Sequence, residues 1–236
     1  MTQFRHDSWQ RAYSEYLIDL LQTYGVDLIV DAGAHNGRFA RGVRQAGFQG
    51  QILSFEPVQQ YFDAAERAAL RDDRWIVLPI ALGDFDGQTT INVSAGTGSS
   101  ILSANAYGKA HFSDLRTTSR QVVEIRRLAT ILTERRSYEN DRAVFIKMDT
   151  QGYDLNVLRG LGDQASRISI FQSEMSVIKI YDDMPSMSEA LVAFETAGFE
   201  PTAFFPVTTQ IFSGRVVEFD CIMVNRDEAR RLELNT

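Results

Sequence analysis

The chain has 236 residues, of which 44% are hydrophobic and 23% are charged, and this is enough for one sizeable core. Its net charge of -7 gives no overall attraction to a phosphate backbone, and a single cysteine, Cys221, excludes an internal disulfide framework. No run approaches the roughly 18 apolar residues of a membrane-spanning helix. We therefore expect a cytoplasmic protein with no membrane and no nucleic-acid partner.

The first 25 residues predict an amphipathic helix. Apolar and aromatic residues recur there at helical spacing, and Gly25 is typical of a helix end. The residues on this face are Trp9, Tyr13, Tyr16, Leu17, Leu20 and Tyr24. We divide the chain into an N-terminal helical extension, residues 1–25, and one domain, residues 26–236. The aromatic face could pack on a neighbouring chain, which leaves a homo-oligomer open.

Short β-rich runs then alternate with helix-like stretches. The runs lie at Leu28–Asp31, Gln51–Glu56, Trp75–Ala81, Val144–Asp149, Ile168–Glu174 and Phe219–Val224. Strands that are apolar on both faces and separated by helices indicate a parallel sheet covered on both sides, and hence a doubly wound α/β domain. From about Asp84 to Asp141 this alternation breaks, and we expect a strand followed by a long loop over the sheet edge.

Two further predicted features lie toward the end of the chain. Ser186 and Glu189 have the spacing of a capping box at a helix start, and the runs Ala203–Phe212 and Val216–Val224 predict an antiparallel hairpin. The one basic cluster brackets a helix-like stretch, and we interpret it as a solvated face. Its members are Arg126, Arg127, Arg135 and Arg136.

Polar residues and glycines follow the first two strands, where ligands bind in doubly wound sheets. Strand one runs into Asp31-Ala-Gly33-Ala-His35-Asn36-Gly37, and strand two ends at Glu56. Glycines allow close approach to a ligand, and an acid roughly 20 residues further on can accept hydrogen bonds from a ribose diol. The G-x-x-x-G spacing differs from the dinucleotide pattern, and the acid beside it suits a bound cation. This combination favours S-adenosylmethionine, with a plain tight turn as the alternative reading of the glycines alone.

Six blocks resemble, in order, the FkbM-type S-adenosylmethionine-dependent methyltransferases. They are "VDAGAHNGRFA", "SFEP", "IALGD", "GSSIL", "IKMDTQGYDLNVLRG" and "ISIFQSEM", spread over about Val26 to Val224. The resemblance implies a Rossmann-like fold, with a mostly parallel seven-stranded sheet, helices on both faces and a C-terminal antiparallel hairpin. It also implies O-methylation of a hydroxyl on a sugar or small natural-product metabolite.

The same resemblance implies which residues hold the cofactor. Asp31, Gly33 and Gly37, with His35 and Asn36, would line its methionine end, and Glu56 would hold the ribose with Pro57 and Val58 beside it. Ala81, Leu82 and Gly83 would flank the adenine, and Ser99, Ser100, Asp149 and Gln151 lie in blocks near the site. Where the family block usually reads "VEG", this chain has Thr150-Gln151-Gly152. The neutral Gln151 removes one carboxylate, so we expect no metal, although Asp149, Asp154 and Glu174 could supply oxygens.

A hydroxyl acceptor must lose its proton to a positioned base. Asp149 and Glu174, at or near the ends of their strands, are the leading candidates, and His111 is a further one. Three structural alternatives stay open: Asp149 could cap the helix near Gly152, Glu174 could pair with Lys147, and His111 could be solvent-exposed.

The acceptor itself is less defined by the sequence. Phe204, Phe205, Tyr181 and Met184 could form the wall of an acceptor pocket or ordinary core. The alternative functions are N- or carboxyl-methylation on the same fold, or a catalytically inactive nucleoside-binding module.

Overall fold

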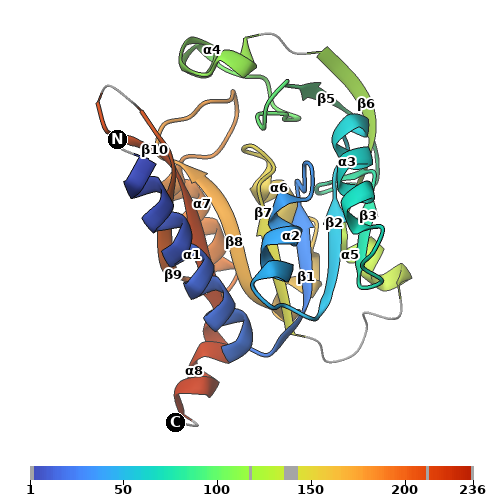
Figure 1. Cartoon of the computed structure of the whole chain (residues 1–236), viewed down its shortest axis with the longest axis vertical. Helices are drawn as coiled ribbons and strands as arrows, with labels where there is room; N and C mark the ends of the chain where they lie inside the picture. The colour runs from blue at the N-terminus through green and yellow to red at the C-terminus, as the bar shows by residue number, and fades with distance from the viewer. Residues whose placement is uncertain (1–2, 117–118, 136–142, 211–212, 235–236) are drawn as a thin grey trace.

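The computed structural model describes residues 3–116, 119–135, 143–210 and 213–234. Arg136, Asp141 and the end of the predicted run Ala203–Phe212 lie outside these ranges. The elements (Figure 1) are α1 (Gln3–Thr23), β1 (Val26–Ala32), α2 (Arg38–Gln45), β2 (Gln51–Phe55), α3 (Gln59–Ala69), β3 (Trp75–Leu78), β4 (Ile80–Leu82), β5 (Gly87–Val93), α4 (Ala106–His111), η1 (Ser113–Leu115), β6 (Ser119–Arg126), α5 (Leu128–Glu134), β7 (Ala143–Met148), α6 (Asp154–Arg159), η3 (Gly162–Arg167), β8 (Ile168–Ser176), α7 (Met187–Thr196), β9 (Phe199–Thr209), β10 (Val216–Asn225) and α8 (Arg226–Leu234).

Seven strands form one mostly parallel sheet in the order β3-β2-β1-β7-β8-β10-β9. The pairs from β3 to β8 are parallel, and β10 is antiparallel to both β8 and β9. The chain moves outward from β1 to β2 and β3, and later returns to the other side of β1 with β7. The ends of β1 and β7 therefore flank the point where strand order reverses, which is where such sheets bind ligands. The predicted fold class and the C-terminal hairpin are confirmed.

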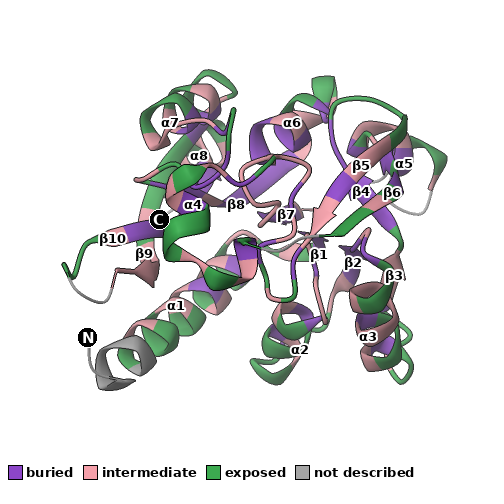
Figure 2. Ribbon diagram, turned by 90° about the horizontal axis from the view of Figure 1, so that it is seen from above, coloured by how far each residue is buried: buried purple, intermediate pink, exposed green. Residues whose placement is uncertain are grey.

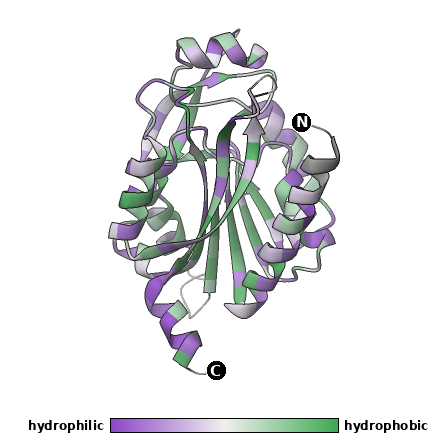
Figure 3. Ribbon diagram, turned by 90° about the vertical axis from the view of Figure 1, so that its left-hand side faces the viewer, coloured by the Kyte–Doolittle hydropathy of each residue, from purple (hydrophilic) through white to green (hydrophobic). Residues whose placement is uncertain are grey.

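Helices cover both faces of this sheet, as Figure 2 shows from above. On one face α1, α2 and α3 pack with Leu17, Ala40 and Ala69 against strand residues such as Ile29 and Phe145. On the other face α5, α6 and α7 supply a second apolar layer, with side chains that include Ile131, Leu158 and Phe194. The strands are therefore hydrophobic along most of their length, while polar residues gather on the outer faces of the helices (Figure 3).

The middle of the chain differs from its prediction. The run Trp75–Ala81 is not one strand: it divides at Pro79 into β3 in the large sheet and β4 in a second sheet. Proline has no N–H to donate, which ends the pairing there. The expected long loop also contains β6, and the three strands β4-β6-β5 form a small sheet. Val123 and Ile125 of β6 are buried at the alternate positions that a strand requires.

The chain enters the large sheet through the turn at Gly25, whose φ of 61° is in the left-handed region that favours glycine. Before this turn, α1 runs along the sheet beside β1 and β9, and it buries Leu17 and Leu21 there. Near the other end of the chain, α7 begins with the predicted capping box, in which Ser186 and Glu189 bond to each other's backbone N–H.

Candidate active site

The turn after β1 touches the end of β7. Gly33 has a φ of 79°, and a Cβ atom built on it would lie 2.1 Å from the backbone oxygen of Asp149. No side chain fits at this position, so a glycine is required for the two strand ends to meet. The turn also bonds to β2. The backbone N–H groups of Gly33 and Ala34 both donate to the carbonyl of Phe55, at 3.0 Å. The turn therefore holds the ends of three strands together.

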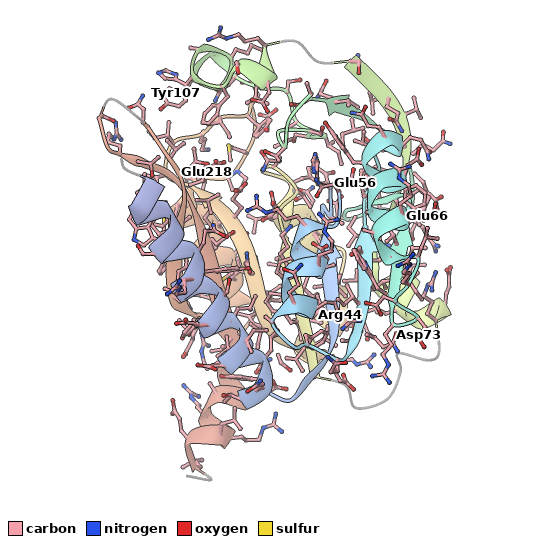
Figure 4. All side chains as sticks on the ribbon, in the orientation of Figure 1. Arg44, Glu56, Glu66, Asp73, Tyr107 and Glu218 are labelled. Carbon is pink, nitrogen blue, oxygen red and sulfur yellow. The ribbon has the colours of Figure 1, made fainter. Side chains whose placement is uncertain are left out.

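Glu56 lies at the end of β2 and closes the same turn. Its Oε2 accepts the backbone N–H of His35 at 2.7 Å, and its Oε1 accepts that of Val58 at 2.9 Å. Burial raises the pKa of this carboxyl to about 7, although the two backbone hydrogen bonds act in the opposite direction. Figure 4 shows Glu56 at the upper end of β2, where the strand ends converge.

A cavity opens beside Glu56, and we call it the strand-end cavity. It has about 670 Å³ of space, including its opening to solvent. One wall is apolar, with Ile80, Ile91 and Ile101. Predicted site residues that line it are Gly33, His35, Glu56, Pro57, Ala81, Leu82, Ser99 and Asp149. The ring of His35 packs against that of Tyr61 in a tilted arrangement, with centroids 3.9 Å apart.

A second hollow, the α1 groove, lies between α1, α2 and the ends of β7, β8 and β10. It encloses about 1,780 Å³ including open solvent. Its polar lining includes Tyr13, Asn36, Lys147, Gln151, Gln172, Glu174 and Asp220. The groove and the strand-end cavity share four lining residues, Gly33, His35, Thr97 and Asp149. The two hollows therefore meet at the turn after β1 and at Asp149.

Asp149 takes part in a charged network at this junction. The Nζ of Lys147 lies 3.4 Å from Asp149 Oδ2 and 3.4 Å from Asp31 Oδ1, and it donates to the carbonyl of Gly33 at 3.3 Å. Asp31 is fully buried, and its Oδ2 accepts the hydroxyl hydrogen of Ser54 at 3.1 Å. Among the described residues, Lys147 is thus paired with Asp31 and Asp149, not with Glu174.

Glu174 faces other acids and one amide. Its Oε2 accepts a hydrogen bond from Gln151 Nε2 at 2.7 Å. Burial raises the pKa of Glu174 well above its ordinary value, and the nearby carboxyls of Glu218, Asp149 and Asp220 raise it further. Asp220 lies opposite Glu174 in the β8–β10 register, and Glu218 lies opposite Ser176. Figure 4 labels Glu218 at the same end of the sheet as Glu56.

Several predicted site residues lie behind the cavity walls. Asp31, Gly37, Val58 and Ser100 are buried and line neither hollow. Gly37 packs under Trp75, because a Cβ there would lie 2.7 Å from the indole ring. Ser100 donates to the carbonyl of Gln151 at 2.7 Å and so supports the loop after β7.

His111 lies apart from both hollows, at the exposed end of α4. Its ring stacks on Tyr107, with centroids 4.0 Å apart. The alternative role for Asp149 as a helix cap is not seen, because α6 begins at Asp154 and the preceding Tyr153 makes no side-chain cap. Asp154 instead accepts the N–H of Thr150 at 3.0 Å.

The four side chains suggested for an acceptor wall line neither hollow. Tyr181 and Met184 are buried in a small apolar cluster, Phe205 packs against Tyr13, and Phe204 is 41% exposed.

In the basic cluster, Arg126 pairs with Glu134 at 2.6 Å and Arg127 with Asp86 at 2.9 Å. Within the described ranges, no group of three or more His, Cys, Asp and Glu side chains could hold a metal ion. None of the helices in the described part of the chain has the length and apolar character that crossing a membrane requires.

Sequence reasoning missed several residues of the two hollows. Tyr61 and Tyr153 line the strand-end cavity, and Tyr13, Gln172 and Asp220 line the α1 groove. Lys147 carries a readable signal, since a lysine in an otherwise apolar central strand requires a buried partner. The others lie in helices, in strands or, for Tyr153, just before α6, and no local pattern marks them.

The side chains of the strand-end cavity fit an adenosine group with a cationic end. A carboxylate at Glu56 suits a ribose diol, isoleucines and Leu82 suit a base, and the acid at Asp149 suits a positive charge. The donor set therefore agrees with the cofactor that the sequence motifs predict.

Comparisons with known proteins identify the family of the chain. The family model described as the methyltransferase FkbM domain matches residues 31–201. The chain is 24% identical over 184 residues to methyltransferase sdnD of Sordaria araneosa, covering 66% of this chain and 68% of that protein.

Among solved structures, magnesium protoporphyrin IX methyltransferase from Synechocystis PCC 6803 with bound SAM has a TM-score of 0.51 at 10% identity, covering 95% of this chain and 85% of that one. Its complex with SAH has a TM-score of 0.48 at 9% identity, with 95% and 88% covered. At this identity the likeness shows the fold, whereas the family model covers more than half of the chain. The chain therefore belongs to the FkbM methyltransferase family, whose methyl donor is S-adenosylmethionine.

Proposed function

We propose that the protein transfers a methyl group to a hydroxyl of a small acceptor, a sugar or natural-product metabolite, and that Asp149 accepts the hydroxyl proton. The observation that carries the proposal is the position of Asp149, which lines both the strand-end cavity and the α1 groove. A cofactor in the cavity and an acceptor in the groove would meet at its carboxylate. A base must lie within hydrogen-bond reach of the proton that it takes, and the place of Asp149 where the two hollows meet supports this role.

We assign the strand-end cavity to S-adenosylmethionine. Glu56 would accept the ribose hydroxyls, Ala81 and Leu82 would flank the adenine, and Gly33, His35 and Asn36 would hold the methionine end. Bound there, the cofactor supplies a methyl group on a sulfonium, which is already activated for transfer. The work left to the protein is to align the acceptor oxygen, exclude water and accept a proton.

The surroundings of Asp149 suit a proton acceptor. The ammonium of Lys147 and one amide hydrogen of Gln151 stabilise its charge, at 3.4 and 2.9 Å. Its side chain is 36% exposed, whereas Asp31 on the other side of Lys147 is fully buried. Asp149 is therefore the member of this ion pair that an acceptor can reach. Glu174, across Gln151, is a second acid in the groove and a candidate to receive the proton afterwards.

The groove supplies polar and charged groups for a small polar acceptor. Its lining combines the acids Glu174 and Asp220, beside Asp149, with the cations Lys147, Arg38 and Arg41. Tyr13 and Gln172 add groups that hydrogen-bond to hydroxyls.

The substitution Asp149→Asn tests this assignment. The amide keeps the shape of the side chain but accepts no proton, so turnover with an active hydroxyl acceptor should fall about 100-fold or more. Affinity for the neutral product S-adenosylhomocysteine should stay within about threefold, because the product carries no sulfonium charge. Product formation and calorimetric binding measure the two effects. Asp73→Asn, an exposed acid away from both hollows, is the matched control (Figure 4).

A panel of hydroxyl, amine and carboxylate compounds separates the alternatives. Methylation of sugars or other alcohols supports the proposal, while methylation of amines or carboxylates alone contradicts it. Cofactor binding without transfer to any compound would favour a nucleoside-binding module. Equal losses of turnover and of product affinity in Asp149→Asn would make Asp149 a binding residue rather than the base.

A further inference from the structure

Gln151 connects the two acids of the transfer site. Its Nε2 donates to Asp149 Oδ1 at 2.9 Å and to Glu174 Oε2 at 2.7 Å. Its Oε1 lies 2.8 Å from the hydroxyl of Tyr181, which donates to it. The backbone of Gln151 has a φ of 54°, and its carbonyl accepts the hydroxyl hydrogen of Ser100 at 2.7 Å. Both ends of the amide and its backbone are thus held.

These contacts leave one orientation for the amide. An amide nitrogen only donates and an amide oxygen only accepts, so Nε2 faces the two carboxyls and Oε1 faces the phenol. Tyr181 is buried and also lies 3.0 Å from the carbonyl of Gly98, so acceptors surround its hydroxyl and it acts as a donor. Each carboxyl therefore receives one N–H from the same nitrogen. An acid at position 151 would instead place three carboxyl groups in contact.

We propose that Gln151 is the positioning residue of the transfer site, which holds Asp149 and Glu174 toward the shared junction with one N–H each and keeps Asp149 ready to accept a proton. The inference rests on the proposed function of Asp149. Its physical basis is that a hydrogen bond to an ionised carboxylate favours the charged form, whereas neighbouring carboxyls disfavour it. Gln151 separates two acids that would otherwise compete for one proton, as closely placed acids do.

Other charged groups face this network, and all of them contribute to its titration. Lys147 and Asp31 lie on the Asp149 side, and Glu218, Asp220 and Asp154 lie on the Glu174 side. Tyr13 is close to Lys147, and Tyr181 to Glu174, while His35 is close to Asp149. Since these groups are the same in a position-151 variant, a change in pH dependence between the variant and the wild type reports on residue 151.

The binding of two cofactor analogues measures the electrostatics of this network without an acceptor. S-adenosylhomocysteine carries a neutral thioether, and sinefungin carries a primary ammonium group on carbon in place of the methyl-bearing sulfonium. The ratio of their dissociation constants measures the interaction of a cation with the acids at the transfer point. In the wild type we expect sinefungin to bind about tenfold more tightly than the thioether at pH 8, and the preference to fade as the acids protonate.

Gln151→Asn and Gln151→Glu are the test variants. Asparagine tolerates a positive φ but is one methylene shorter, so it cannot reach both carboxyls. We expect it to reduce the sinefungin preference about threefold or more at pH 7 and to raise by about one unit the pH at which the preference appears. Glutamate adds a third acid, so it should raise that pH too, and should exceed the wild-type preference at pH 8.5 or above. Affinity for S-adenosylhomocysteine should stay within about threefold in both.

Tyr181→Phe is the supporting variant, because it removes the donor that orients the amide and leaves both acids and Gln151 in place. A shift in the same direction as that of Gln151→Asn supports positioning by the amide. The proposal is overturned if both position-151 variants keep the wild-type ratio and pH dependence, or if they weaken both analogues equally, as a merely structural role would. A wild type that binds neither analogue would refute the proposed function itself. A preference abolished by Asp149→Asn but unaffected at position 151 would refute only the role of Gln151.

Discussion

At the scale of single residues, the site depends on acids whose neighbours decide their charge. Glu56 is 5% exposed, so burial alone would favour its neutral form. Two backbone N–H groups, from His35 and Val58, offset part of this cost and leave its pKa at about 7. A ribose diol would donate to the ionised form. In the proposed cofactor site, binding of the ribose and protonation of Glu56 would therefore be linked.

This linkage predicts a pH-dependent affinity for S-adenosylhomocysteine. A carboxyl that titrates at about 7 in the free protein and is ionised in the complex should make binding about tenfold tighter at pH 8 than at pH 6. Calorimetry at both pH values, in buffers of different ionisation enthalpy, measures the affinity and the proton release.

Glu56→Gln is the matched variant for this effect. It should bind about 10-fold or more weakly at pH 8, because the amide oxygen cannot accept the bonds that two carboxylate oxygens accept. It should also lose most of the change between pH 6 and pH 8. If the variant kept the wild-type pH dependence, another group would be responsible, with Asp220 as the first candidate, since its pKa is also raised to about 7.

At the scale of elements, α1 has two roles. Its inner face buries Leu17 and Leu21 in the layer formed with Ile29, Phe145 and Ile222. The helix also lines the α1 groove with Tyr13, whose hydroxyl donates to Gln172 of β8 at 2.8 Å. The sequence predicts this helix as an extension of the domain. These contacts predict in addition that the stability of the folded domain depends on the helix.

Two leucine substitutions test this dependence. Leu17→Ala removes a side chain that is 2% exposed, and it should lower the free energy of unfolding by about 2–4 kcal/mol through lost burial and the cavity left behind. Leu70→Ala, the same change where the side chain is 76% exposed, should alter it by less than about 0.5 kcal/mol. Urea denaturation measures both values. Equal, small effects would show that α1 is a separable extension.

At the scale of the whole molecule, the binding end of the sheet concentrates acids with raised pKa values. Burial raises the pKa of Glu56 and of Asp220 to about 7, and it raises those of Asp31, Asp154, Glu174 and Glu218 as well. Each has a higher pKa in the folded chain than in the unfolded chain. Between about pH 4.5 and 7 the folded chain therefore binds more protons, and stability falls as the pH rises through this window.

The free protein should thus be more stable at pH 6 than at pH 8. Counting only the two groups that titrate at about 7, and discounting Asp220 for its partial exposure, we expect a difference of about 1–2 kcal/mol in the free energy of unfolding. His35, whose pKa is lowered by burial, acts in the opposite direction near its ordinary pKa. Urea denaturation at the two pH values and equal ionic strength measures the difference. A stability that is constant or rises with pH would contradict the prediction, and Glu56→Gln should reduce the difference.

The amino-acid sequence by itself determined the features that local patterns encode. Apolar runs separated by helical stretches predicted the doubly wound sheet and its C-terminal hairpin, because strand and helix periods are properties of short segments. The acid in β1, the glycines after it and the glutamate after β2 predicted a cofactor site at this edge, because parallel strands bring consecutive carboxyl ends to one edge. The position of Asp149 at the end of β7 followed in the same way.

Only the tertiary structure decided which partners these residues have. Sequence reasoning treated Gln151 as the loss of a charge, whereas the fold places its amide between Asp149 and Glu174. It also pairs Lys147 with Asp31 and Asp149, and it brings α1 beside β8 to form the groove. The physical reason is that strand register and the path of the chain set distances between residues far apart in sequence, and no local periodicity carries that information.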